Sequence, residues 1–244
     1  DPIAVALTAQ IGGSGGGTLT CAVVNTGNLV LTTASSKTVE GTLLNAGTIT
    51  QSGSGAMNVT SFRHGDALFR NEAAGTYVVS ATTVSNSVNA SGRFENLGTY
   101  RRTAASGTTT ITGTGRFINQ GEVEVLSGAL DVGGNQTHSG SWDVSSGADV
   151  EFFNGTTQSF VAGTTFTGAG DVRFLNVTAN VYANLTAPNV FIESSTANLV
   201  VAAGLLFDWT GISFFRAGRI SGSGQVRNQG TLLFSTSGTK TIDA

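Results

Sequence analysis

The chain repeats one short phrase along most of its length. Residues 92–100 read "GRFENLGTY", residues 115–123 read "GRFINQGEV" and residues 224–232 read "GQVRNQGTL". All three share the pattern G-x-Φ-x-N-x-G-x-Φ, in which Φ is an apolar residue. Self-similarity at a spacing of roughly 20–50 residues is the signature of repeat architectures, in which stacked units share one core. This repeat therefore restricts the fold more than any other feature of the sequence.

The copies recur at a fairly even spacing. The first Φ of the copies falls at Val23, Leu43, Phe69, Phe94, Phe117, Trp142, Phe174 and Val226. The steps between them are 20, 26, 25, 23, 25, 32 and 52 residues, so the spacing is close to 25 and one copy in the last interval has diverged.

Each position of the phrase has a physical interpretation. The alternation Φ-x-Φ is the two-residue period of a strand with one buried face. Gly and Asn favour a corner between two short strands, because both tolerate backbone conformations that other residues avoid. We therefore predict a ladder of stacked corner amides at Asn25, Asn45, Asn71, Asn96, Asn119, Asn176 and Asn228. We predict a column of inward aromatic rings at Phe69, Phe94, Phe117, Trp142 and Phe174.

The period distinguishes between the architectures that use many short strands. A sandwich or barrel places turns every 8–12 residues or so, and a propeller blade takes roughly 40–50 residues. The sequence instead predicts an all-β fold, a single-stranded parallel β-solenoid (β-helix) of about nine or ten coils of roughly 25 residues. Residues 1–17, with the glycine run "GGSGGG", are expected to be a flexible or pairing lead-in, and residues 18–244 one continuous solenoid domain.

Composition narrows the classes of partner. Charged residues are 11% of the chain and the net charge is −3, with no basic patch, so we expect no nucleic-acid binding. No apolar run is long enough for a membrane-spanning helix. Cys21 is the single cysteine, which leaves no intramolecular disulfide. Its alternating neighbours, "TLTCAVVN", predict a small buried side chain.

Residues that could carry chemistry are sparse. Asp131, Asp143, Asp149 and Glu151 form the densest acidic group, and Asp149 and Glu151 would share one strand face. Such carboxylates can serve glycoside chemistry when they converge in a groove, but on a solenoid they more often cover a solvated face. The two histidines, His64 and His138, lie in turn-like contexts without zinc-ligand spacing. We therefore expect no catalytic, metal or cofactor site, with a polysaccharide lyase or hydrolase as the alternative.

Threonine pairs raise a weaker alternative. Thr-x-Thr occurs at Thr18/Thr20, Thr48/Thr50, Thr110/Thr112, Thr165/Thr167 and Thr239/Thr241. A flat array of such pairs would suit an ice-binding solenoid, but it needs a pair in nearly every coil, and these gaps do not supply one. Ordinary exposed strand threonines explain them better.

The repeated phrase in a chain rich in Gly, Thr and Asn resembles the β-helical repeats of large bacterial secreted and surface proteins. These are the autotransporter passenger domains and the filamentous-haemagglutinin-like adhesins. The resemblance covers most of residues 18–236 and carries no catalytic residues. It implies an extracellular or cell-surface structural or adhesive role.

Because the phrase is still running near the last residues, we expect partners at the solenoid ends: a second copy stacked head-to-tail, or flanking repeats of a longer chain. Surface glycans are a further candidate partner, and a carbohydrate-binding β-helix is the alternative function.

Overall fold

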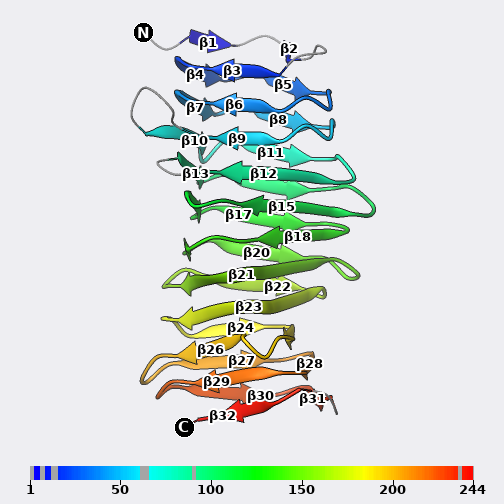
Figure 1. Ribbon diagram of the computed structural model, residues 1–244, viewed down its shortest axis with the longest axis vertical. Coiled ribbons are helices and arrows are strands. Elements are labelled where there is room, and N and C mark those ends of the chain that lie inside the picture. Colours follow the sequence, from blue (N-terminus) through cyan, green and yellow to red (C-terminus); the bar gives the residue numbers. More distant parts are fainter. Residues whose placement is uncertain are drawn as a thin grey trace.

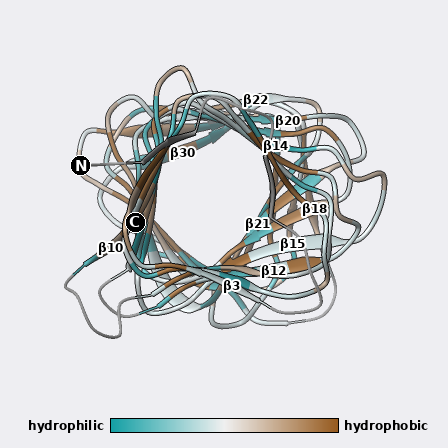
Figure 2. Ribbon diagram, turned by 90° about the horizontal axis from the view of Figure 1, so that it is seen from above, coloured by the Kyte–Doolittle hydropathy of each residue, from teal (hydrophilic) through white to brown (hydrophobic). Residues whose placement is uncertain are grey.

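The computed structural model describes residues 16–60, 66–89, 92–235 and 238–243, together with the backbone of Ile3–Val5 and Ala9–Ile11. Every regular element within these residues is a β-strand, and every strand pairing is parallel. The strands stack into an elongated rod of about ten turns with the two termini at opposite ends (Figure 1). Viewed along the rod, successive coils superpose around one interior (Figure 2). The predicted β-solenoid is confirmed.

Each coil contributes one strand to each of three faces. The first face contains β1 (Ile3–Val5), β4 (Ala22–Asn25), β7 (Thr42–Asn45), β10 (Ala67–Asn71), β13 (Gly92–Asn96), β16 (Arg116–Asn119), β19 (Gln136–His138), β26 (Asn198–Val201), β29 (Gly218–Ser221) and β32 (Lys240–Ile242). The second face contains β2 (Ala9–Ile11), β5 (Asn28–Leu31), β8 (Thr48–Gln51), β11 (Thr76–Val79), β14 (Thr99–Arg102), β17 (Glu122–Val125), β20 (Ser141–Val144), β22 (Thr165–Gly168), β24 (Leu185–Ala187), β27 (Leu206–Trp209) and β30 (Gln225–Asn228).

The third face contains β3 (Gly17–Leu19), β6 (Lys37–Val39), β9 (Met57–Val59), β12 (Val84–Val88), β15 (Thr108–Thr112), β18 (Ala129–Val132), β25 (Asn189–Ile192), β28 (Ile212–Phe215) and β31 (Thr231–Phe234). Two long strands, β21 (Asp149–Phe160) and β23 (Asp171–Val181), run from the third face onto the first. The corner in β21 is a register shift between Phe153 and Thr156, where Asn154 has φ 82°.

Two segments of the expected lead-in already belong to the solenoid. The strands β1 and β2 pair in register with β4 and β5. Most of the glycine run, residues 12–15, lies outside the described residues, as does His64. Cys21 is exposed, contrary to expectation, because it sits in a bend before β4 and not within the alternating strand.

Five of the predicted corner asparagines form a continuous hydrogen-bonded ladder. Each Nδ2 donates to the Oδ1 of the asparagine in the next coil, from Asn25 to Asn45 (2.7 Å), to Asn71 (2.7 Å), to Asn96 (2.8 Å) and to Asn119 (2.9 Å). All five side chains are buried. The amide hydrogens that remain donate to backbone carbonyls, so the corners satisfy their own polar groups inside the rod.

Two predicted ladder residues lie elsewhere. Asn176 is exposed with φ 52° at the corner of β23, and its Oδ1 accepts a hydrogen bond from Thr196 (2.6 Å). Asn228 is exposed on the second face, where it pairs in register with Trp209. The position after Asn119 in the ladder is taken by His138, which is buried in strand β19 and not in a turn.

The aromatic column is also shorter than predicted. Phe69, Phe94 and Phe117 do stack along the first face, with ring centroids 4.5 and 5.1 Å apart. Trp142, however, pairs with Val123 on the second face, and Phe174 pairs with Phe152 on the third. Both remain core residues.

The predicted ladder and column residues after Phe117 and Asn119 lie elsewhere because the coil that follows these two residues is short. Neighbouring coils are 20 to 26 residues apart up to Phe117, but Ile118 pairs with Thr137, only 19 residues on. A step of 25 from Phe117 therefore reaches the next strand of the coil. On the first face the later coils keep steps of 20 to 22 residues.

The phrase glycines have a steric role. Gly47, Gly98 and Gly121 do not have positive φ, but a Cβ on any of them would lie 2.2 Å from a carbonyl oxygen of the preceding coil. Because real Cβ atoms do not approach oxygen so closely, only glycine allows these corners to stack at the spacing of adjacent strands.

Candidate functional site

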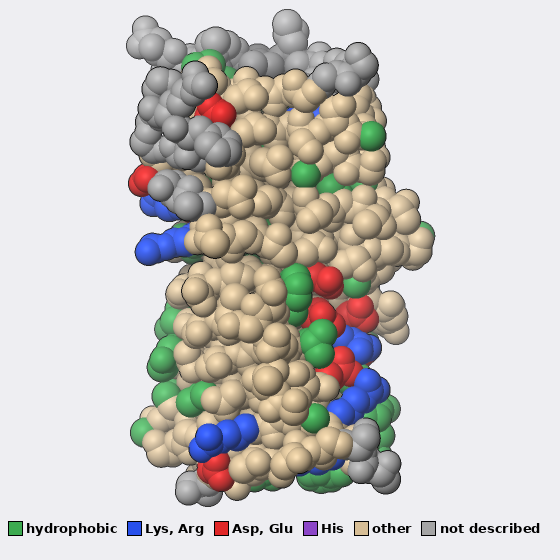
Figure 3. Space-filling model, viewed as in Figure 1, with side chains coloured by type: hydrophobic (Ala, Val, Ile, Leu, Met, Phe, Trp, Pro, Cys, Tyr) green, Lys and Arg blue, Asp and Glu red, His purple; other side chains and the backbone are tan. Residues whose placement is uncertain are grey.

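One surface of the rod gathers four of the ten ion pairs formed among the described residues. It lies on the outward side of the third face, over β18 to β28, and we call it the charged patch: Asp131, Asp149, Glu151, Asp171, Arg173, Glu193 and Arg216. In the view of Figure 3 the acidic and basic side chains gather along the right-hand side of the lower half.

Strand register brings these residues together. Asp131 of β18 lies opposite Glu151 of β21, and Glu151 lies opposite Arg173 of β23. Asp149 lies opposite Asp171 in the same two strands, β21 and β23. The outward positions of adjacent strands are about 4.8 Å apart, so the patch is two parallel rows of charge along the rod.

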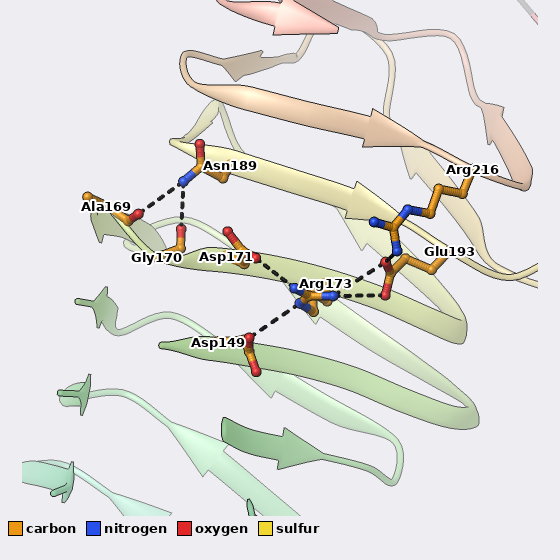
Figure 4. A network of polar contacts seen from close by, with 8 residues as sticks. All are labelled: Asp149, Ala169, Gly170, Asp171, Arg173, Asn189, Glu193 and Arg216. Atoms are coloured by element: carbon orange, nitrogen blue, oxygen red, sulfur yellow. Dashed lines mark hydrogen bonds and ion pairs between the residues drawn. The ribbon is translucent and has the colours of Figure 1, made fainter. Parts of the chain in front are cut away.

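Arg173 is the centre of the patch (Figure 4). Its guanidinium lies 2.7 Å from Asp171, 3.3 Å from Glu193 and 3.5 Å from Asp149. Glu193 also pairs with Arg216 of the next coil. These contacts link four successive coils from the outside. Asn189 adds a neutral link, donating through Nδ2 to the carbonyls of Ala169 (3.1 Å) and Gly170 (3.2 Å).

The arginines of the patch cover two phenylalanines that face outward. Phe191 and Phe214 follow Arg173 in the same row, and their rings stack with centroids 4.8 Å apart. The Arg173 guanidinium lies 4.6 Å from the Phe191 centroid, and that of Arg216 lies 5.1 Å from the Phe214 centroid. Phe191 is only 6% exposed although it points away from the core. These cation–π contacts shield apolar rings that would otherwise meet water.

The patch has more acid than base. Five carboxylates share two guanidiniums, and no ion pair joins Asp131 or Glu151 to a cation within the described part of the chain. Burial, reinforced by Asp149, raises the pKa of Asp131 to about 6. Burial, reinforced chiefly by Asp131 and Glu193, raises the pKa of Glu151 to about 7 against the opposing effect of Arg173. Burial also raises the pKa of Asp149.

The predicted acidic group is therefore brought together only in part. Asp131, Asp149 and Glu151 converge, whereas Asp143 lies on the second face, where it accepts a hydrogen bond from Thr167 (3.1 Å). Sequence reasoning missed Asp171, Arg173 and Glu193. A signal for two of them was present, because the segments "GADVEFF" at 147–153 and "AGDVRFL" at 169–175 place Asp171 and Arg173 at the same points of the repeat as Asp149 and Glu151.

The other candidate residues do not form a site. His138 is enclosed by Phe117, Trp142, Phe152 and Phe160, and its Nε2 lies 2.9 Å from Gln158 Oε1. Within the described ranges, no three His, Cys, Asp or Glu side chains are placed to hold a metal ion. The threonine pairs are divided between faces: Thr48/Thr50 and Thr165/Thr167 lie on the second, Thr110/Thr112 on the third.

Fold and surface together define a β-solenoid repeat protein. Comparison of the chain with protein-family models, with curated proteins and with solved structures finds no match. In the portion of the chain that the structure describes, no helix is long and apolar enough to cross a membrane.

Proposed function

We propose that this chain is a structural or adhesive element of the extracellular surface, a rod-like subunit or segment of a fibre. The observation that carries the proposal is the uninterrupted core. Coil after coil presents the same inward positions, and side chains from all three faces are fully buried from β6 to β28. Repeat proteins of this kind gain stability from each neighbouring interface, so that length and stiffness grow together.

The surface supports the same function. The charged patch makes its ion pairs within the rod, and Arg173 holds carboxylates from three coils. Such contacts reinforce stacking from outside. The last coils add a surface on which further coils can pair: Phe234 is 57% exposed, Ile242 is 63% exposed, and an apolar hollow of about 620 Å³ opens between Trp209, Phe215 and Leu232. We propose that this edge pairs with further coils, of a second copy or of flanking repeats, in the same parallel register.

Two experiments test the proposal. Antibodies raised against the purified chain should label intact, unpermeabilised cells of the source organism, and label confined to permeabilised cells contradicts an extracellular role. The purified chain should also form linear particles in electron micrographs at high concentration, with a concentration-dependent mass by light scattering. A variant that carries both Phe234→Glu and Ile242→Glu should form shorter particles than the wild-type chain does. A monodisperse monomer at every concentration contradicts head-to-tail pairing.

Carbohydrate binding is the second candidate. The observation that favours it is the convergence of Asp131, Asp149 and Glu151 on the same outward surface as the Phe191 and Phe214 rings, with Arg173 between them. A glycan array with the wild-type chain and with Asp149→Asn tests it. Binding that the variant loses supports a glycan partner, and the absence of any glycan signal contradicts it.

A further inference from the structure

Asp131 and Glu151 are the two carboxylates of the patch that form no ion pair with its arginines. They lie directly opposite each other on adjacent strands, with outward positions about 4.8 Å apart. On the other side of Asp131 the register partner is Thr110 of β15, which is uncharged. Each carboxyl is partly withdrawn from water. A pair of like charges at this spacing raises the free energy of the coil unless one carboxyl holds a proton.

The nearby cations are already engaged. Arg102, which is fully buried, donates to backbone carbonyls, among them Ala129 O (2.7 Å), Gly107 O (2.7 Å) and Ser106 O (2.9 Å). Arg173 lies opposite Glu151, but its ion pairs go to other carboxylates. The charged groups that act on the pair from the surrounding elements are Arg102, Asp149, Arg173 and Glu193, and Asp171 of β23 acts on Asp149 and Arg173. Asp149 raises the pKa of both carboxyls and Glu193 that of Glu151, whereas each arginine opposes the shift at only one carboxyl, so the surroundings also favour protonation.

We propose that the Asp131–Glu151 pair is a proton-linked element that tightens the middle of the solenoid in mildly acidic surroundings and loosens it in neutral to alkaline ones. Both carboxyls have pKa values above the ordinary range of about 3.9 to 4.3 for Asp and Glu in an unfolded chain. The cost of the charged pair is therefore fully present above about pH 7. It is relieved as the pH falls toward about 4, where the unfolded chain binds protons equally well.

Local hydrogen exchange measures this effect where it occurs. Amide protection in β18 and β21 should be about tenfold higher at pH 5 than at pH 8, after correction for the intrinsic exchange rate at each pH. One unit of pKa difference corresponds to tenfold, and the partial exposure of the pair reduces the full shift to about that size. Protection in β11, which is far along the rod, is the internal reference.

Three variants define the outcome. Asp131→Asn and Glu151→Gln should each raise protection at pH 8 and reduce the pH dependence in β18 and β21. Asp143→Asn, on the second face, should leave both unchanged. Equal protection at pH 5 and pH 8 in the wild type, or full pH dependence in Glu151→Gln, overturns the proposal. A carbon-detected titration of the wild-type Glu151 carboxyl does not depend on the folding of the variants. Its midpoint should be near 7, and a midpoint below about 5 overturns the proposal.

Discussion

Removal of Asn96 should break the asparagine ladder between Asn71 and Asn119. The Asn96 side chain is fully buried and makes three hydrogen bonds: it accepts from Asn71 Nδ2 (2.8 Å) and donates to Asn119 Oδ1 (2.9 Å) and to the carbonyl of Glu122 (2.9 Å). Each bond contributes about 1 kcal/mol net. Asn96→Ala also leaves Asn119 Oδ1 buried without a donor, which adds about 1–3 kcal/mol. The expected loss is therefore about 4–6 kcal/mol in this coil.

The same phrase supplies the control. Asn228 occupies the matching position of its own copy, but it is exposed and its side chain donates only to Gly230 O (2.8 Å). Asn228→Ala should change stability by about 0.5 kcal/mol or less. Asn96→Asp tests the direction of the ladder, because a carboxylate accepts from Asn71 but cannot donate to Asn119. Hydrogen exchange of β13 and β16 with urea unfolding measures all three. Equal losses in Asn96→Ala and Asn228→Ala would refute the reasoning.

Other perturbations address the core, the corners and the buried ionisable groups. Phe117→Ala should cost about 3–5 kcal/mol in urea unfolding, and a loss under about 1 kcal/mol means that the aromatic column is not core. Gly98→Ala should cost roughly 1–3 kcal/mol, because the added methyl group overpacks against the preceding coil. Gly204→Ala, at φ +74° with open space around it, should cost only about 1 kcal/mol. Equal losses in the two variants contradict the steric role of Gly98. Arg102→Met should cost about 3 kcal/mol because several backbone carbonyls lose their donor. Arg102→Lys should recover part of this loss. A Met variant as stable as the wild type contradicts the role of Arg102. Burial lowers the pKa of His138 to about 4, so its contribution, about 3 kcal/mol at most, is complete above pH 6.5 and lost as the pH falls through 4. Acid unfolding of the wild type and His138→Gln checks this, and identical acid midpoints contradict it.

The sequence was sufficient for the fold and for the first half of the core. Where the phrase is intact, its asparagines and phenylalanines identify the inward positions of successive coils, as at Phe94 and Asn96 and again at Phe117 and Asn119. The inward and outward alternation of β17 was equally readable: Val123 and Val125 are buried, and Glu122 and Glu124 face outward.

The rest was obscured by a change of coil length. Between Phe117 and the next coil the repeat shortens, and Gln136 and His138 replace the expected Phe and Asn at the stacked positions. The packing tolerates these residues because Gln136 Oε1 accepts from Phe117 N and His138 fits among aromatic rings. A pattern that requires an apolar residue followed by Asn cannot detect such replacements. The alignment of the phrase therefore shifts from the first face to Trp142 on the second face.

The charged patch could not be predicted for a related reason. Glu193 meets Arg173 across a coil boundary, 20 residues away in the sequence, and only the register decides which charges become neighbours. Burial and local charge then set the pKa values of Asp131 and Glu151, which depend on the assembled surface and not on either residue alone.

The central claim is that successive coils stack in register at one strand spacing. Paired spin labels on the outward side of the second face measure this directly, in a Cys21→Ser background. Asn28, Glu122, Ser141 and Thr165 occupy the same outward row, because each step of the register connects them. With Asn28 as the common position, the backbone separations should be about 19, 24 and 29 Å, rising by about 4.8 Å for each coil. Distances that do not increase evenly along this series would contradict the solenoid.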